Sequence, residues 1–151
     1  MLAHVPLEAS RICGDIEALA LGTTFEAVLF ASCLINNPDA AIRATQLARC
    51  REHLKPGGRL IFERYDPGWL ADVQVGTLGK AGDIEMRVDE VQRDGRNVYL
   101  CLRYRHGAEE WLHCFTDAIL TDDDVHRCLF SAGFASPSWI DRRWGVAEAI
   151  A

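Results

Sequence analysis

The sequence lacks the features that mark several classes of protein. No apolar run approaches the roughly 20 residues that a membrane-spanning helix needs. Residues 1–6 have neither the basic region nor the apolar core of a signal peptide. The formal net charge is −6, which disfavours binding to nucleic acid or to an anionic membrane. We therefore expect a cytoplasmic protein with no nucleic-acid or membrane partner.

Cysteine is present but its spacing is uninformative. The six cysteines include no Cys-x-x-Cys pair, and His106 and His113 lack metal-ligand spacing. We expect the cysteines to be small core residues, with no disulfide framework and no metal site. The 151 residues are enough for one domain with a sizeable core. No internal repeat or low-complexity segment suggests a second one.

Two short apolar runs dominate the first half of the chain. Residues 28–31 and 60–62 predict strands that are buried on both faces of a parallel sheet. A helix between them is expected to begin with Asn37 as N-cap and Pro38 as its first residue, and to stop at residues 55–58. Its predicted apolar stripe consists of Ala40, Ala44, Leu47, Ala48 and Leu54. Strand, crossover helix and strand together predict a right-handed unit of an open α/β sheet.

The period of the apolar pattern changes to two in the second half. Residues 84–88, 98–104 and 111–115 predict three antiparallel strands, with a turn at Asp94-Gly95. This β-meander is compatible with a structural sheet or a dimer-forming sheet, and the pattern does not choose between them.

The carboxy-terminal part predicts one more helix and two strands. Thr121 is the expected N-cap, with Asp124 completing an acidic variant of the capping box, and Gly133 ends the helix. Residues 138–142 and 146–150 then predict two closing strands, where Trp139 and Trp144 are expected to pack.

Several of these segments, taken in order, resemble class I S-adenosylmethionine-dependent methyltransferases that act on small molecules. They are Ile-Cys-Gly-Asp-Ile-Glu-Ala-Leu at 12–19, Phe-Glu-Ala-Val at 25–28, Leu-Ile-Asn at 34–36, Leu-Lys-Pro-Gly-Gly at 54–58, Leu-Thr-Asp-Asp-Asp-Val at 120–125 and Ala-Gly-Phe at 132–134. The resemblance implies an α/β fold, namely a truncated Rossmann-like sheet with the counterparts of family strands 3 to 7 and an inserted antiparallel β-meander. Residues 9–13 would be the first of these strands, and the meander would form a wall of the acceptor pocket. It also implies one methyltransferase-like domain over residues 1–151, lacking the amino-terminal part of the family fold.

The resemblance assigns four residues to the cofactor. Asp15 would accept a hydrogen bond from the adenine amino group and Ile16 would touch the ring, although without the resemblance a polar turn is the simpler interpretation. Ala31 and Ser32 follow a strand, at the sheet edge where α/β folds bind ligands. The family's glycine-rich loop and the acidic residue of its second strand have no counterpart here. We therefore expect weak or absent binding of S-adenosylmethionine.

Acceptor and catalytic candidates lie at the same predicted edge. Asn36, Arg64 and Trp69 are candidates for binding a small-molecule substrate, with Arg64 suited to an anionic group. The candidates for acid–base chemistry are Cys33, Glu63, Tyr65 and Asp66. An unperturbed thiol is mostly protonated at neutral pH, so we prefer a structural role for Cys33. The sequence leaves the remaining roles open.

The predicted truncation would leave the strand at residues 28–31 without a neighbour. Either residues 9–13 pair with it, or a second copy or partner chain covers this edge, and we expect a homodimer. Three functions stay open. The chain is part of a small-molecule methyltransferase that is incomplete by itself, a repurposed cofactor-independent biosynthetic enzyme, or a non-catalytic binding or dimerisation module.

Overall fold

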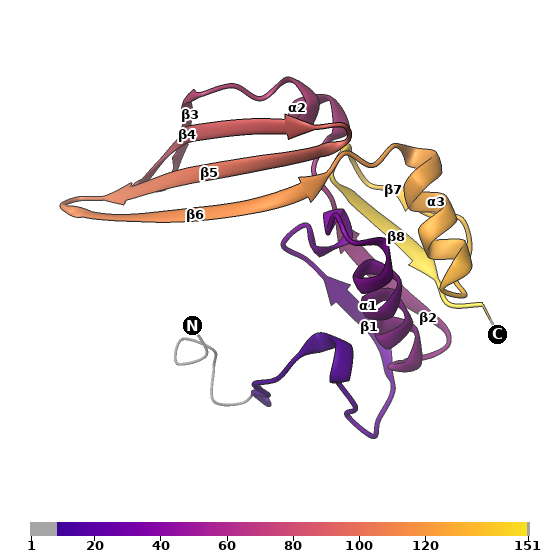
Figure 1. The fold of residues 1–151 in the computed structure, drawn as a ribbon. Coiled ribbons are helices and arrows are strands. Elements are labelled where there is room, and N and C mark those ends of the chain that lie inside the picture. The colour runs from indigo at the N-terminus through magenta and orange to yellow at the C-terminus, as the bar shows by residue number, and fades with distance from the viewer. Residues whose placement is uncertain (1–8, 151) are drawn as a thin grey trace.

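The computed structural model describes residues 9–150, which form two four-stranded sheets. The first sheet has the strand order β1-β2-β8-β7 and the second has the order β3-β4-β5-β6. Figure 1 shows the second sheet extending away from the first as a separate layer. The elements are η2 (Ile16–Ala18), β1 (Phe25–Phe30), η3 (Leu34–Asn36), α1 (Ala40–Glu52), β2 (Leu54–Glu63), α2 (Pro67–Asp72), β3 (Gly76–Ala81), β4 (Ile84–Asp94), β5 (Asn97–His106), β6 (Glu109–Ala118), α3 (Asp122–Ser131), β7 (Ser138–Trp139) and β8 (Trp144–Glu148).

The predicted strand–helix–strand unit is confirmed. β1 and β2 are parallel neighbours, and α1 connects them. The α/β fold class follows from this unit together with the antiparallel strands around it. β8 joins β2 in antiparallel fashion and carries β7 at the sheet edge, so the two predicted closing strands are also confirmed, with bounds shifted by a few residues.

The predicted boundaries of α1 were wrong. The N-cap is Asp39 rather than Asn37, because the Asp39 carboxylate accepts hydrogen bonds from the amides of Ala41 and Ile42. Asn37 instead accepts from the Asp39 amide. The helix ends at Glu52, before the predicted stop, because the chain is already extended in β2 from Leu54 onward.

The predicted stripe on α1 was only partly right. Leu47 is buried and Ala48 is half-buried, but Ala40 and Ala44 are exposed. Leu54 belongs to β2. The buried side of the helix consists of Gln46, Leu47 and Cys50.

The capping box of α3 is confirmed and sets the start of that helix. The Thr121 hydroxyl accepts from the Asp124 amide at 3.2 Å, and the Asp124 carboxylate accepts from the Thr121 amide at 2.9 Å. Gly133 follows the helix with φ of 84°, the left-handed conformation that glycine adopts after a helix.

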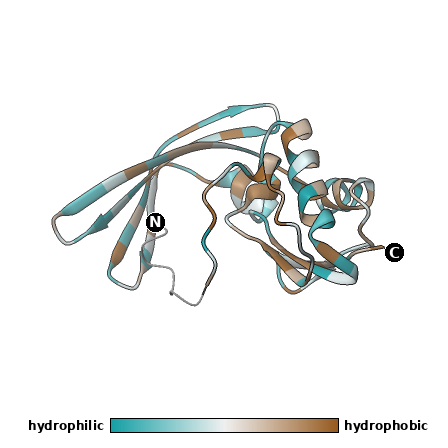
Figure 2. Cartoon of the chain, turned by 90° about the horizontal axis from the view of Figure 1, so that it is seen from below, coloured by the Kyte–Doolittle hydropathy of each residue, from teal (hydrophilic) through white to brown (hydrophobic). Residues whose placement is uncertain are grey.

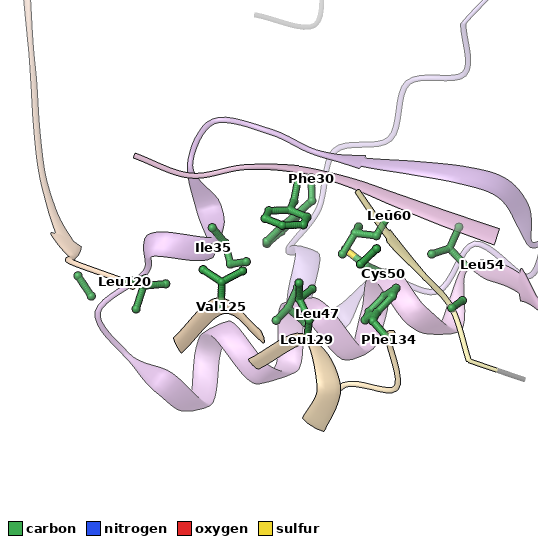
Figure 3. Packing of buried hydrophobic residues seen from close by; sticks show 14 residues of the cluster. Phe30, Ile35, Leu47, Cys50, Leu54, Leu60, Leu120, Val125, Leu129 and Phe134 are labelled. Carbon is green, nitrogen blue, oxygen red and sulfur yellow. The ribbon is translucent and has the colours of Figure 1, made fainter. Parts of the chain in front are cut away.

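One face of the first sheet packs against α1 and α3. Figure 3 shows the side chains of Phe30 and Leu60 between the sheet and the helices, where they meet Leu47, Leu129 and Phe134. All five are at most 3% exposed. Burial of such side chains contributes roughly 1.5–3 kcal/mol each, which makes this cluster the main core of the chain.

The other face of this sheet is open in residues 9–150, so the prediction that both strands are buried on two faces was wrong for β1. Leu29 is 64% exposed and Phe25 is 39% exposed. The predicted strand at residues 9–13 was also wrong, because these residues are exposed and have no strand conformation. Within the described residues β1 therefore pairs with β2 alone.

The predicted β-meander is confirmed as β4, β5 and β6, and β3 adds a fourth strand that was not predicted. Figure 2 shows the alternation of hydrophilic and hydrophobic residues along these strands. Val98, Leu100 and Leu102 form the buried side and pack against Leu70 of α2. This second cluster fixes α2 on the meander, immediately after the end of β2.

The expectation that the cysteines are mostly small core residues without a disulfide was wrong for Cys13, which is exposed, and for the pair Cys101 and Cys114. Cys101 and Cys114 lie directly opposite each other on β5 and β6 and form a disulfide. Cys13 is exposed, whereas Cys33 and Cys50 are buried. None of the helices between residues 9 and 150 combines the length and hydropathy of a membrane span.

Candidate functional site

The two sheets meet at the carboxyl ends of β1 and β2. The loop after β1, the segment after β2 and the last part of β6 line a cavity of about 200 Å³ that is open to solvent on one side. This is the edge where open α/β sheets bind ligands. The lining residues are Ser32, Cys33, Leu34, Asn37, Tyr65, His113, Phe115, Thr116 and Asp117. We call this space the inter-sheet cavity.

The loop after β1 has an unusual backbone. Ser32 and Cys33 have φ angles of 61° and 55°, which place two consecutive non-glycine residues in the left-handed region. Each such residue costs on the order of 1 kcal/mol, so the surroundings must hold the loop. The Ser32 amide donates to Glu63 Oε2 at 2.9 Å, and Glu63 Oε1 accepts from Arg143 at 2.5 Å.

Asn36 joins this loop to both neighbouring segments. Its side chain is fully buried. Nδ2 donates to the Ala118 carbonyl at 2.9 Å, and Oδ1 accepts from the Tyr65 amide at 3.0 Å. Because both ends of the amide are engaged by the backbone, Asn36 holds the walls of the cavity together. Its predicted contact with a substrate stays a prediction.

Cys33 lines the cavity with a thiol that is buried. Desolvation, followed by the negative charge of Glu63, raises the pKa of Cys33 to about 12, although Arg143 opposes this. The thiol is therefore protonated at neutral pH and unsuited to be a base or a nucleophile in this conformation.

Tyr65 forms an aromatic wall. Its ring stacks between Trp69, at 5.4 Å between centroids, and Phe115, at 6.0 Å. Burial raises the pKa of the phenol, and Cys33 and Asp117 add to the effect. Tyr65 can consequently donate a hydrogen bond but does not ionise near neutral pH.

Asp117 is the residue that sequence reasoning missed. It lies near the end of β6 on the same strand face as His113 and Phe115, because alternate strand residues share a face. Burial raises the pKa of Asp117 to about 7. The sequence does contain a hint of this site. In the run Phe115-Thr116-Asp117-Ala118, a charged residue occupies the position of a strand that faces the same side as Phe115.

Two other predicted residues are engaged in the fold. Arg64 is 4% exposed, and its guanidinium donates to the carbonyls of Arg142 and Leu120 and to the Asp122 carboxylate at 2.5 Å. It also lies 3.9 Å from the centre of the Trp139 ring. These contacts give Arg64 a structural role, and an anionic acceptor would have to compete with them.

Asp66 is the N-cap of α2. Its carboxylate accepts from the amides of Gly68 and Trp69, at 2.8 and 3.1 Å. Burial pushes its pKa upward, but the two amides and Arg142 outweigh this, so the pKa of Asp66 is lowered. A carboxylate held ionised by its own helix is a weak candidate for acid–base chemistry at neutral pH.

A second, wider cavity of about 480 Å³ lies on the other side of Tyr65. Trp69 and Asp66 line it together with Asp141, Arg142 and Arg143. Tyr65 is thus shared by both cavities, and Trp69 is exposed to the wider one. The predicted catalytic and substrate residues are brought close to one another around Tyr65.

The four predicted cofactor residues are not gathered in the same way. Ser32 lines the inter-sheet cavity, but Asp15, Ile16 and Ala31 do not. Asp15 caps η2, where its carboxylate accepts from the Glu17 amide at 3.0 Å. The Glu17 carbonyl accepts from Arg49 in the second half of α1, whereas Ser32 precedes α1. Asp15 and Ser32 therefore lie in different parts of the first sheet's surroundings, and the cofactor roles of all four residues stay predictions.

No known protein-family model matches the sequence, and no curated protein matches it. Solved structures do match. An S-adenosylmethionine-dependent methyltransferase from Clostridium acetobutylicum matches with a TM-score of 0.73 and 14% identity, over 93% of this chain and 64% of that one.

Two further matches have more specific descriptions. The sugar N-methyltransferase KedS8 from a Streptoalloteichus species has a TM-score of 0.68 and 18% identity, over 91% of this chain and 61% of that one. CalS10 is an amino pentose methyltransferase from Micromonospora echinaspora, solved with S-adenosylmethionine bound. It has a TM-score of 0.61 and 21% identity, over 89% of this chain and 62% of that one.

At these identities the likeness shows the fold. The chain has the Rossmann-like architecture of small-molecule methyltransferases over about nine-tenths of its length, and it spans a little under two thirds of the length of these structures.

Proposed function

We propose that the chain supplies the acceptor-binding part of an S-adenosylmethionine-dependent methyltransferase that acts on a small molecule. The observation that carries the proposal is the inter-sheet cavity at the carboxyl ends of β1 and β2, in a fold shared with such enzymes. Ligand binding at this edge is the general rule for open α/β sheets.

The residues around the cavity are suited to positioning. Tyr65 and Phe115 offer stacked aromatic surfaces, and Ser32 and Asn37 add polar groups at the rim. When bound, S-adenosylmethionine supplies an electrophilic methyl group. Correct placement of the acceptor can by itself contribute several kcal/mol to such a transfer.

We further propose that this chain alone binds S-adenosylmethionine weakly. Asp15 and Ser32 do not line one cavity, so few contacts can form at the same time. Each missing hydrogen bond is worth on the order of 1 kcal/mol, and about 1.4 kcal/mol changes the affinity tenfold.

Calorimetric titration with S-adenosylmethionine tests this point directly. We expect no saturation at micromolar cofactor. A low-micromolar dissociation constant at one site per chain would contradict weak binding and would indicate a complete enzyme. Asp15→Ala, with Asp83→Ala as a matched exposed control, would then show whether Asp15 contributes.

Mass spectrometry of small amines and alcohols incubated with the chain tests the methyl transfer itself. At millimolar S-adenosylmethionine we expect a methylated product, and Tyr65→Ala should reduce its rate. Absence of any methylated product at saturating cofactor would contradict the proposal and favour the cofactor-independent or non-catalytic alternatives.

We also propose that a second copy covers the edge of β1. This strand is apolar apart from Glu26, which pairs with Lys55, and its outer edge has no partner strand within residues 9–150. Open edges of this kind favour strand pairing, and a two-fold axis lets the same edge be used twice.

Light scattering coupled to size-exclusion chromatography distinguishes the possibilities. The unmodified chain should be a dimer, and Leu29→Lys should yield monomer or aggregate. Phe130→Lys is the control, because Phe130 is similarly exposed, at 66% against 64% for Leu29, but lies on α3. A stable monomer of the unmodified chain would rule out the dimer.

A further inference from the structure

The inter-sheet cavity combines one carboxylate with aromatic walls. Asp117 lies on β6 next to the Phe115 ring, which stacks on Tyr65 at 6.0 Å, and the His113 ring lies 4.8 Å from Phe115. Aromatic faces and a carboxylate are the surroundings that stabilise an organic ammonium group.

Each element that lines the cavity places a titratable side chain near Asp117. Cys33 follows β1, Tyr65 follows β2, and His113 precedes Asp117 on β6. Glu63 and Arg143 lie behind Cys33 and neutralise each other through their ion pair. Cys33 and Tyr65 are neutral near pH 7, and within residues 9–150 no salt bridge involves Asp117.

The cavity volume limits what can enter. A cavity of about 150 Å³ is enough for benzene, so about 200 Å³ accommodates one six-membered ring with a single amino group. Larger parts of a ligand would have to extend past Tyr65 or into solvent.

We propose that the inter-sheet cavity is an amine site, in which the Asp117 carboxylate pairs with the ammonium group of the acceptor and removes one of its protons. The proton moves from nitrogen to the carboxylate, which leaves a neutral amine with a free electron pair and a protonated Asp117. That this amine then accepts a methyl group rests on the proposed function. That the amine binds at Asp117 does not depend on it.

The acid–base properties of the group agree with this role. Burial brings the pKa of Asp117 to about 7, so the carboxylate is partly ionised at neutral pH and can accept a proton. A side chain titrating near the working pH is the most effective proton acceptor.

Titration with cyclohexylamine tests the site, and cyclohexanol is the neutral probe of the same shape. At pH 8 the wild-type chain should bind cyclohexylammonium at least about tenfold more tightly than cyclohexanol, the worth of one charge-assisted hydrogen bond. Equal binding of the two probes would overturn the inference, whatever the behaviour of any variant.

Asp117→Asn keeps the shape of the side chain and removes its charge. Binding of cyclohexylammonium should fall about tenfold and that of cyclohexanol should stay constant. Asp83→Asn, in the exposed turn between β3 and β4, is the matched control and should change neither. An unchanged affinity in folded Asp117→Asn would also overturn the inference.

The pH dependence separates Asp117 from His113. Affinity for cyclohexylammonium should rise with pH until Asp117 is ionised, by up to about tenfold per pH unit, and then level off. This rise should disappear in Asp117→Asn. A rise that persists in that variant would assign the effect to His113 and contradict the proposal.

The methyl-transfer assay has a separate outcome. Asp117-dependent amine binding without any methylated product would retain the amine site and refute the proposed function. Methylated alcohols without amine binding would refute the amine site and support the proposed function.

Discussion

Replacement of Asn36 by leucine should destabilise the chain substantially. Asn36 is fully buried, and its side chain satisfies the Ala118 carbonyl and the Tyr65 amide at once. Leucine has a similar size but offers no hydrogen bond. Both backbone groups would lose their partner in a place where Ala118 itself is only 7% exposed.

The magnitude follows from these two groups. A buried polar group left without a partner costs about 1–3 kcal/mol, which gives about 2–6 kcal/mol for the pair. Burial of the leucine side chain offsets roughly 1.5 kcal/mol. We expect a net loss of about 0.5–4.5 kcal/mol, to be compared with the 5–15 kcal/mol typical of a domain.

Urea unfolding followed by far-ultraviolet circular dichroism measures this loss. Asn97→Leu is the matched control, since Asn97 is exposed at the start of β5, and its effect should stay within about 0.5 kcal/mol. A loss for Asn36→Leu that is no larger than the loss for Asn97→Leu would refute the view that Asn36 joins the two sheets. It would leave the amide free for a substrate.

Three further predictions concern charge and redox state. Because the pKa of Asp117 is raised to about 7, folding favours its protonated form, and stability should fall as pH rises from about 4 to 7. Asp117→Asn should remove this fall and be more stable than the wild type at pH 8 by on the order of 1–3 kcal/mol, allowing for partial exposure, as chemical unfolding across pH would show. Hydrogen bonding to Arg96 lowers the pKa of Asp124 against the effect of burial, and Thr121 adds to the lowering. Asp124→Asn should cost about 1–2 kcal/mol at pH 7, and that cost should shrink as pH falls below about 4, so a constant cost down to pH 2 would contradict it. Finally, Cys114→Ser should lower thermal stability by about 2–3 kcal/mol because it opens a loop of 13 residues closed by Cys101, and a reductant should lower the wild type equally but leave the variant unchanged.

Local patterns in the sequence were sufficient for most of the architecture. The apolar runs around Val28 and Leu60 predicted the parallel pair, although the face of β1 that carries Leu29 is exposed. The alternation through Ile84, Met86 and Val88 predicted the meander, and Thr121 with Asp124 predicted the start of α3. In each case the sequence pattern that supports the prediction spans only a few residues, whereas the strand pairing itself joins distant residues.

The helix boundaries show the limit of local reasoning. Asn37 and Asp39 are both good N-caps, and the choice of Asp39 depends on the η3 turn that Asn36 fixes through contacts with Ala118 and Tyr65. The partner of β1 could not be predicted from the sequence either. Whether residues 9–13 form a strand beside β1 depends on residues that are close in space but distant along the chain.

The sequence by itself determined the α/β class, the order of the elements and the gathering of Cys33, Glu63 and Tyr65 at one sheet edge. Only the tertiary structure decided what these residues do there. It placed Arg64 in a structural network, buried Cys33 as a neutral thiol and brought Asp117 from the meander into the same cavity. The physical reason is that desolvation and long-range hydrogen bonds set the protonation and the freedom of a side chain, and both depend on residues far away in the sequence.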